Sequence, residues 1–129
     1  MQNASPVILV IDDDRGLRNT LRRILVRHGY EVLCASDGEA ALAAARHHEG
    51  PIDVVLSDVR MAGASGPEIL ARLRAHSPNA RLILMSGYVD RVTATDDGGA
   101  AVPFLEKPFG TRTLLDTILQ LLAEQRPAA

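Results

Sequence analysis

Five apolar runs of strand length alternate along this chain with longer segments of helical spacing. The runs carry few polar residues, which is typical of strands that are covered by helices on both faces. Repeated alternation of strand and helix predicts right-handed crossovers and a parallel sheet between two layers of helices, that is, a three-layer α/β fold. We expect the strands at Val7–Asp12, Glu31–Ala35, Asp53–Asp58, Arg81–Ser86 and Val102–Glu106, in the spatial order 2-1-3-4-5.

The ends of the helical segments are marked by capping and helix-breaking residues. Gly29 ends the first segment, whose leucines and isoleucine form one stripe. Ser36-x-x-Glu39 and Ser65-x-x-Glu68 are capping-box patterns, which predict the starts of the second and third helices. We expect Ser77-Pro78-Asn79 to end the third helix and Asp14 to cap the first.

Two later segments differ in how strongly they predict a helix. Val89–Ala101 has little periodicity and contains Asp96-Asp97-Gly98-Gly99, so we expect a fourth helix that is short or irregular. The last helix is predicted by a stripe of apolar residues at helical spacing, namely Leu114, Leu115, Ile118, Leu121 and Leu122.

Length and composition indicate one domain. The 129 residues fit a single unit, residues 1–129, with a core at about residues 7–123. The net charge of −2 argues against a basic surface, so we expect no direct DNA binding. Cys34 is the only cysteine, which excludes an intrachain disulfide and favours a reducing, cytoplasmic setting. The first residues lack the basic and apolar regions of an export signal, and no apolar run approaches the ~20 residues of a membrane span. Because no such run is present we expect no membrane contact by this chain, and because the chain ends soon after the last helix we expect no output domain.

Charged and polar residues follow the strands at their carboxyl ends. Asp12 and Asp13 follow the first run, Asp58 closes the third, and Ser86 and Lys107 close the fourth and fifth. In the expected strand order the first and third strands are neighbours, so the three acids face one crevice at the switch point, where open α/β sheets bind ligands. Clustered carboxylates repel one another unless a cation is present, and Mg²⁺ prefers such ligands together with phosphate oxygens. We therefore expect Asp58 to be a nucleophile that forms an acyl phosphate, with Mg²⁺, Lys107 and the Ser86 hydroxyl neutralising the phosphoryl group.

These residues, in this order and at these strand ends, resemble the receiver domain of two-component response regulators, which has a flavodoxin-like (βα)5 fold. The resemblance extends from Val7 to Leu122, and the residues around Asp58, Ser86 and Lys107 are most similar to receivers attached to hybrid sensor histidine kinases. It implies a signalling domain, not an enzyme acting on an external metabolite, that catalyses its own phosphorylation and dephosphorylation. The implied partner is a sensor histidine kinase or a histidine phosphotransfer protein. We expect a monomer or weak dimer, either free-standing or cut from a larger kinase.

The resemblance also implies how the metal is held. Asp13 is expected to bind Mg²⁺ directly, together with Asp58, and Asp12 is expected to act mainly through water. The backbone carbonyl of Arg60 is expected to complete the metal ligands. We further expect Arg60 and Tyr88, each two residues beyond a site residue, to control the access of water to the acyl phosphate.

The same resemblance implies a switch. Ser86 and Phe104 are expected to move when phosphate arrives, and the Lys107-Pro108 bond is expected to be cis. Ala62 stands where the family usually has proline, so we expect a less rigid loop after the phosphoacceptor.

Two other functions compete with phosphoacceptance. Asp12-x-Asp14 superficially fits the nucleophile motif of haloacid dehalogenase phosphatases, but Arg15-Gly16 replaces the small residues expected next and no cap insertion is present. A protein-interaction module that is not phosphorylated is disfavoured because the acids and Lys107 are all present. His47, His48 and His76 are interpreted as solvated histidines at helix ends, without metal-ligand spacing.

Overall fold

The computed structural model describes residues 5–59, 65–87 and 102–124. Within these ranges five parallel strands form one sheet in the order β2-β1-β3-β4-β5, which confirms the predicted fold and topology. The strands are β1 (Val7–Ile11), β2 (Glu31–Ala35), β3 (Val54–Asp58), β4 (Arg81–Ser86) and β5 (Phe104–Glu106).

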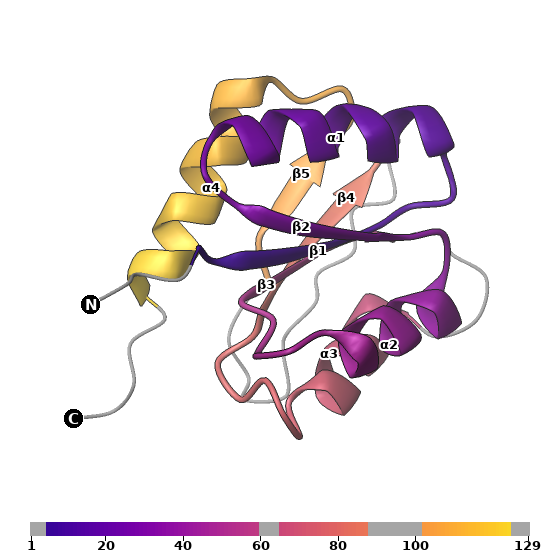
Figure 1. Cartoon of the computed structure of the whole chain (residues 1–129). Coiled ribbons are helices and arrows are strands. Elements are labelled where there is room, and N and C mark those ends of the chain that lie inside the picture. Colours follow the sequence, from indigo (N-terminus) through magenta and orange to yellow (C-terminus); the bar gives the residue numbers. More distant parts are fainter. Residues whose placement is uncertain (1–4, 60–64, 88–101, 125–129) are drawn as a thin grey trace.

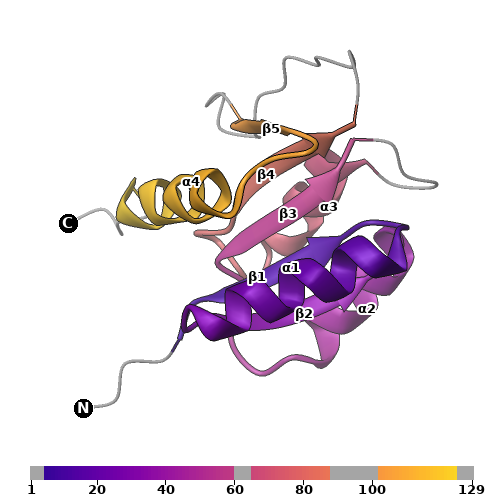
Figure 2. The same ribbon diagram turned by 90° about the horizontal axis from the view of Figure 1, so that it is seen from above.

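Helices cover both faces of the sheet. They are α1 (Arg15–Arg27), α2 (Gly38–His47), α3 (Gly66–Leu73) and α4 (Thr111–Glu124). Helices α1 and α4 lie on one face, and α2 and α3 lie on the other (Figures 1 and 2). The label α4 belongs to the predicted last helix, because the segment Val89–Ala101 lies outside the described residues.

The core has two halves, one on each side of the sheet. Every residue of β1 is buried, and its side chains alternate between the halves. Leu9 and Ile11 pack with α2 and α3, whereas Ile8 and Val10 pack with α1 and α4. Each fully buried leucine or isoleucine contributes about 1.5–3 kcal/mol, so burial on both faces explains why the strand sequences are almost wholly apolar.

The ends of α1 follow the sequence prediction. Asp14 is the N-cap, and its carboxylate accepts a hydrogen bond from the Leu17 amide at 3.2 Å. At the other end His28 is the C-cap, and Gly29 follows with φ of 91°, a conformation that a side chain would strain. Both ends of this helix are therefore encoded locally.

The starts of α2 and α3 differ in how well the capping-box pattern predicts them. Ser65 caps α3, and both bonds of its capping box with Glu68 form, at 2.9 and 3.3 Å. For α2 the prediction is wrong, because Asp37 and not Ser36 is the N-cap and accepts from the Ala40 amide at 2.8 Å. An ionised carboxylate is a stronger acceptor than a hydroxyl at the positive end of a helix, which explains the choice.

Four predicted element ends are displaced: β1 ends at Ile11 and not at Asp12, β5 begins at Phe104 and not at Val102, β3 begins one residue late, and α3 ends early. Asp53, predicted as the first residue of β3, precedes the strand, and its carboxylate accepts from the Val7 amide at 2.7 Å. Helix α3 ends at Leu73 and not at Ser77, whose buried hydroxyl accepts from the Ile52 amide at 2.8 Å. These bonds fix the loops at the end of the sheet away from the acid cluster.

Candidate functional site

The predicted acids meet at the carboxyl end of the sheet. Asp58 is the last residue of β3, and Asp12 and Asp13 follow the neighbouring strand β1, which pairs with β3 in parallel. Each of these side chains offers a carboxylate oxygen, and the three oxygens lie within 4.8 Å of one another. The structure therefore brings together all of the carboxylates that the sequence assigned to a metal.

Lys107 bridges two of these acids. Its ammonium group donates to Asp12 Oδ2 at 2.8 Å and to Asp58 Oδ2 at 2.7 Å. The residue follows β5, and its backbone amide donates to the carbonyl of Ser86 at 2.6 Å. The Lys107-Pro108 peptide bond is cis, as the family resemblance implied. Lys107 is also the single lysine of the sequence.

The three acids differ in burial, and the pKa values of Asp12 and Lys107 are shifted. Asp12 is wholly buried, Asp58 is 8% exposed, and Asp13 is exposed. Burial raises the pKa of the Asp12 carboxyl, although the hydrogen bonds from Lys107 and from the Asp14 amide act in the opposite direction. For Lys107, burial acts against the charged form, but the hydrogen bonds to Asp12 and Asp58 outweigh it, so the pKa of the ammonium is raised and the group is charged at neutral pH.

Every polar group of Asp12 forms a hydrogen bond. Its amide donates to Ala35 O at 3.1 Å, and its carbonyl accepts from Arg18 at 2.8 Å. One carboxylate oxygen accepts from the Asp14 amide at 2.9 Å, and the other accepts from Lys107. Asp13 is different, because no residue in the described ranges forms a hydrogen bond or ion pair with its carboxylate. Asp12 is thus a fixed part of the site, and Asp13 has oxygens available to a ligand.

The other predicted site residues are placed in part. Ser86 is buried at the end of β4, next to the strand that carries Asp58. Phe104 is partly buried and packs against the half of the core that lies under α2 and α3. Arg60, Ala62 and Tyr88 lie outside the described residues, so the expectations for them stay predictions.

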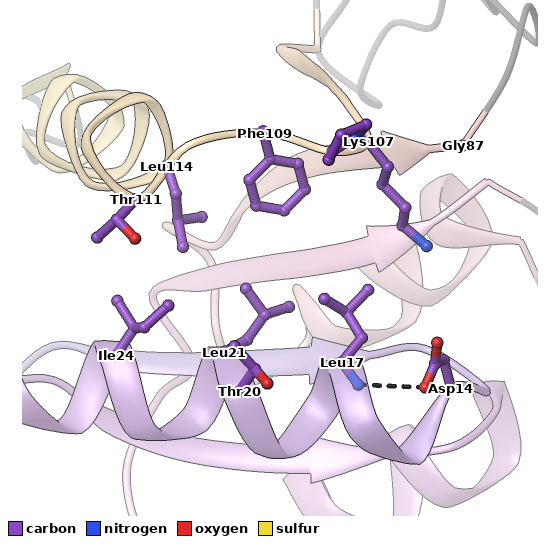
Figure 3. Close-up of a pocket in the computed structure, with 11 residues that line it drawn as sticks. Asp14, Leu17, Thr20, Leu21, Ile24, Gly87, Lys107, Phe109, Thr111 and Leu114 are labelled. Atoms are coloured by element: carbon purple, nitrogen blue, oxygen red, sulfur yellow. Dashed lines mark hydrogen bonds between the residues drawn. The ribbon is translucent and has the colours of Figure 1, made fainter.

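A groove of about 550 Å³ opens beside the site, between α1 and the segment that joins β5 to α4. Figure 3 shows Leu17, Leu21 and Ile24 pointing from α1 toward Phe109 and Leu114 across it. The side chain of Lys107 lies at the end of the groove near Asp14. The site is therefore continuous with a mostly apolar surface hollow.

The interactions that sequence reasoning missed include one at the site and one at the end of α2. Arg18 bonds the Asp12 carbonyl, and the only signal for it is an arginine in the first turns of the helix that follows the acids. The prediction that His48 is solvated is wrong, because its ring lies 2.9 Å from the carboxylate of Glu31 and its side chain is only 12% exposed. The partner in each case is a group that local patterns do not point to.

The fold and the site define a domain of two-component signal transduction. The profile of the response regulator receiver domain matches residues 8–119, and the chain belongs to this family. The family is not that of the haloacid dehalogenase phosphatases, and within the site Asp14 serves as the helix cap and not as the second acid of a phosphatase motif.

Individual relatives include both regulators and kinases. The chain is 35% identical over 124 residues to the response regulator protein FleR of Pseudomonas aeruginosa, covering 95% of this chain and 26% of that protein. It is 33% identical over 124 residues to the sensor kinase CckA of Brucella abortus, covering 95% of this chain and 13% of that protein. The crystal structure of the receiver domain from a hybrid histidine kinase CckA matches with a TM-score of 0.73 and 37% identity, covering 90% of this chain and 98% of that one.

The chain thus spans about a quarter of FleR and about an eighth of CckA. Among the helices that the structure describes, none combines the length and the apolar character needed to cross a membrane.

Proposed function

We propose that this receiver domain accepts a phosphoryl group on Asp58 in a Mg²⁺-dependent reaction with a phosphohistidine partner. The observation that carries the proposal is the placement of Lys107, whose ammonium bonds Asp58 and Asp12 at once, beside the exposed carboxylate of Asp13. Nothing in packing alone favours three acids at this place, because burying like charges is costly.

The residues present fit a magnesium ion. The three carboxylates, when ionised, and the Lys107 ammonium together carry two negative charges, which matches the charge of one divalent cation. Oxygen ligands from a few carboxylates, with room for water and phosphate oxygens, are what Mg²⁺ prefers. We assign Asp13 and Asp58 as direct ligands, Asp12 as a ligand through water, and the backbone carbonyl of Arg60 as a further ligand. When bound, the ion supplies neutralisation of charge on the phosphoryl oxygens.

The chemical step is carried by the chain's own groups. A carboxylate oxygen of Asp58 forms a bond to phosphorus while the bond from phosphorus to the partner's histidine nitrogen breaks; that nitrogen keeps the electron pair and takes a proton from solvent. Lys107, already 2.7 Å from Asp58 Oδ2, shifts its donation to a phosphoryl oxygen. Ser86, one strand away, donates its hydroxyl hydrogen to another, and Phe104 follows its movement.

Partner and setting follow from the same assignment. A sensor histidine kinase or a histidine phosphotransfer protein is the donor, and its phosphohistidine approaches along the open edge where Asp13 is exposed. The apolar groove next to Lys107 provides contact area for that partner. We propose that this occurs in the cytoplasm, with the domain acting as a monomer or weak dimer, and that slow hydrolysis of the acyl phosphate returns it to the resting form.

A small phosphodonor tests the assignment without knowledge of the kinase. Incubation with acetyl phosphate and Mg²⁺, followed by borohydride trapping and peptide mass spectrometry, is expected to place one phosphoryl group on Asp58. Asp58→Asn is expected to abolish the label, and Asp116→Asn, an exposed aspartate on α4, is the matched control that leaves it unchanged. A label on another residue, or labelling that persists in excess chelator, is the result that contradicts the proposal.

A further inference from the structure

The guanidinium group of Arg18 holds the backbone between two of the acids. Arg18 is on α1, and its Nη1 donates to the carbonyl oxygen of Asp12 at 2.8 Å in a part-buried position. The backbone amide of the same residue donates to the Asp14 carbonyl at 3.0 Å, as an ordinary bond at the helix start. Arg18 therefore ties the helix to the turn that carries the acid cluster by both its backbone and its side chain.

The bonded carbonyl belongs to the peptide that joins Asp12 to Asp13. Because a peptide unit is planar, fixing its carbonyl fixes the orientation of the whole unit and with it the direction in which the next side chain leaves the backbone. Asp12 has several other anchors, which are Ala35, the Asp14 amide and Lys107. The side chain of Asp13 has none among the described residues, so its direction depends on the backbone that Arg18 holds.

We propose that Arg18 is a positioning residue for divalent-cation binding, which acts by aiming the carboxylate of Asp13 at the site. This rests on the proposed function, in which Asp13 is a metal ligand. Groups that orient a metal ligand from behind typically change metal affinity by about 10–100-fold when they are removed. No sequence pattern predicted a role for Arg18, which follows from its hydrogen bond to the Asp12 carbonyl.

The sign of the effect separates positioning from simple electrostatics. A guanidinium near a cation site repels the cation, so removing the charge alone strengthens Mg²⁺ binding. Removing the bond to the Asp12 carbonyl weakens Mg²⁺ binding, because Asp13 is then free to turn away. The two explanations thus predict opposite changes for the same substitution.

Arg22 provides the matched control. It lies one turn further along the same helix, is exposed, and forms no hydrogen bond or ion pair with any residue of the described ranges. Arg22→Met removes the same charge from the same helix but breaks no contact with the acid turn.

The experiment is a Mg²⁺ titration by isothermal calorimetry of the full chain and its variants, with unfolding measured in chelator to report stability separately. Arg18→Met is expected to weaken Mg²⁺ binding by about tenfold or more, and Arg18→Lys, which keeps a donor, to recover part of the loss. Arg22→Met is expected to leave the affinity unchanged or slightly stronger. Unchanged or tighter Mg²⁺ binding by Arg18→Met overturns the inference.

Two further outcomes are also decisive. If Arg18→Met does not fold, Arg18→Gln is compared with Arg22→Gln, and equal Mg²⁺ affinities of that pair overturn the inference. If the unaltered protein binds no Mg²⁺, the proposed function itself fails. If the unaltered protein binds Mg²⁺ and its Arg18 variants bind it equally well, only the positioning role of Arg18 fails.

Discussion

The substitution Lys107→Met tests the charge balance of the site most directly. It removes the ammonium that bonds Asp12, which is wholly buried, and Asp58, whose side chain is 11% exposed. Removing one partner of a buried ion pair costs about 3–5 kcal/mol; because the Lys107 side chain is itself 22% exposed, we reduce this to about 2 kcal/mol. At an m-value of about 2 kcal/mol/M, the urea midpoint is expected to fall by about 1 M.

The assay is urea unfolding at neutral pH, followed by circular dichroism, with chelator and then with Mg²⁺. Mg²⁺ is expected to reduce the loss of stability that Lys107→Met causes. A cation that binds only the folded state stabilises it, and the variant has lost a positive charge that competes with the cation. Arg81→Met is the control. The Arg81 side chain is 21% exposed, nearly as exposed as Lys107, but its ion pair with Glu124 is 3.4 Å long and Glu124 is 51% exposed.

The control substitution is expected to cost about 0.5 kcal/mol or less, as is usual for exposed ion pairs. Equal losses for Lys107→Met and Arg81→Met would falsify the reasoning, since the two differ mainly in the burial of their partners. A deficit of Lys107→Met that grows when Mg²⁺ is added would contradict the assignment of the acids to a cation.

Three further substitutions test local features of the fold. His48→Gln is expected to cost about 0.5 kcal/mol near pH 6, because the hydrogen bond to Glu31 raises the pKa of His48. The cost fades toward about pH 9, because stabilisation by a raised histidine pKa is complete below its unfolded value and is lost above the folded one; equal losses in urea titrations at the two pH values would argue against this. Gly66→Ala is expected to destabilise by about 1 kcal/mol, because the new Cβ would lie 3.0 Å from Leu84 Cδ2; a raised melting temperature would contradict the crowding. Ser65→Ala is expected to cost about 1 kcal/mol and to speed amide exchange in the first turn of α3, and unchanged exchange would show that its capping box contributes little.

Much of the fold could be predicted because its causes are local. The strands are apolar runs, and the strand order places Asp12 and Asp58 at one edge through the general rule for parallel α/β sheets. The cap of α1 and its glycine end were also predictable, because each depends on one residue next to the helix. The prediction failed where two adjacent residues could each cap a helix: Asp37, and not Ser36, is the N-cap of α2.

The interactions that sequence reasoning missed depend either on a backbone group or on how segments far apart in the sequence pack together. Arg18 bonds a backbone carbonyl, and every residue has one, so no pattern selects that of Asp12. The pairing of His48 with Glu31 spans 17 positions and depends on where the end of α2 lies against the edge strand. The candidate acids were predictable as a set, but which of them is fixed and which is available became clear only from the hydrogen bonds.

One consequence concerns the chemistry of amines. Since Lys107 is the single lysine of the sequence, it carries the only side-chain amine, and the other strongly basic side chains are all arginines. Acylating reagents and dyes aimed at amines therefore have one side-chain target, the ammonium between Asp12 and Asp58, besides the α-amino group of the chain. Coupling the protein to a surface through Lys107 is expected to remove the proposed phosphoacceptance, and the reaction rate of that amine is expected to change when Mg²⁺ binds the acids beside it.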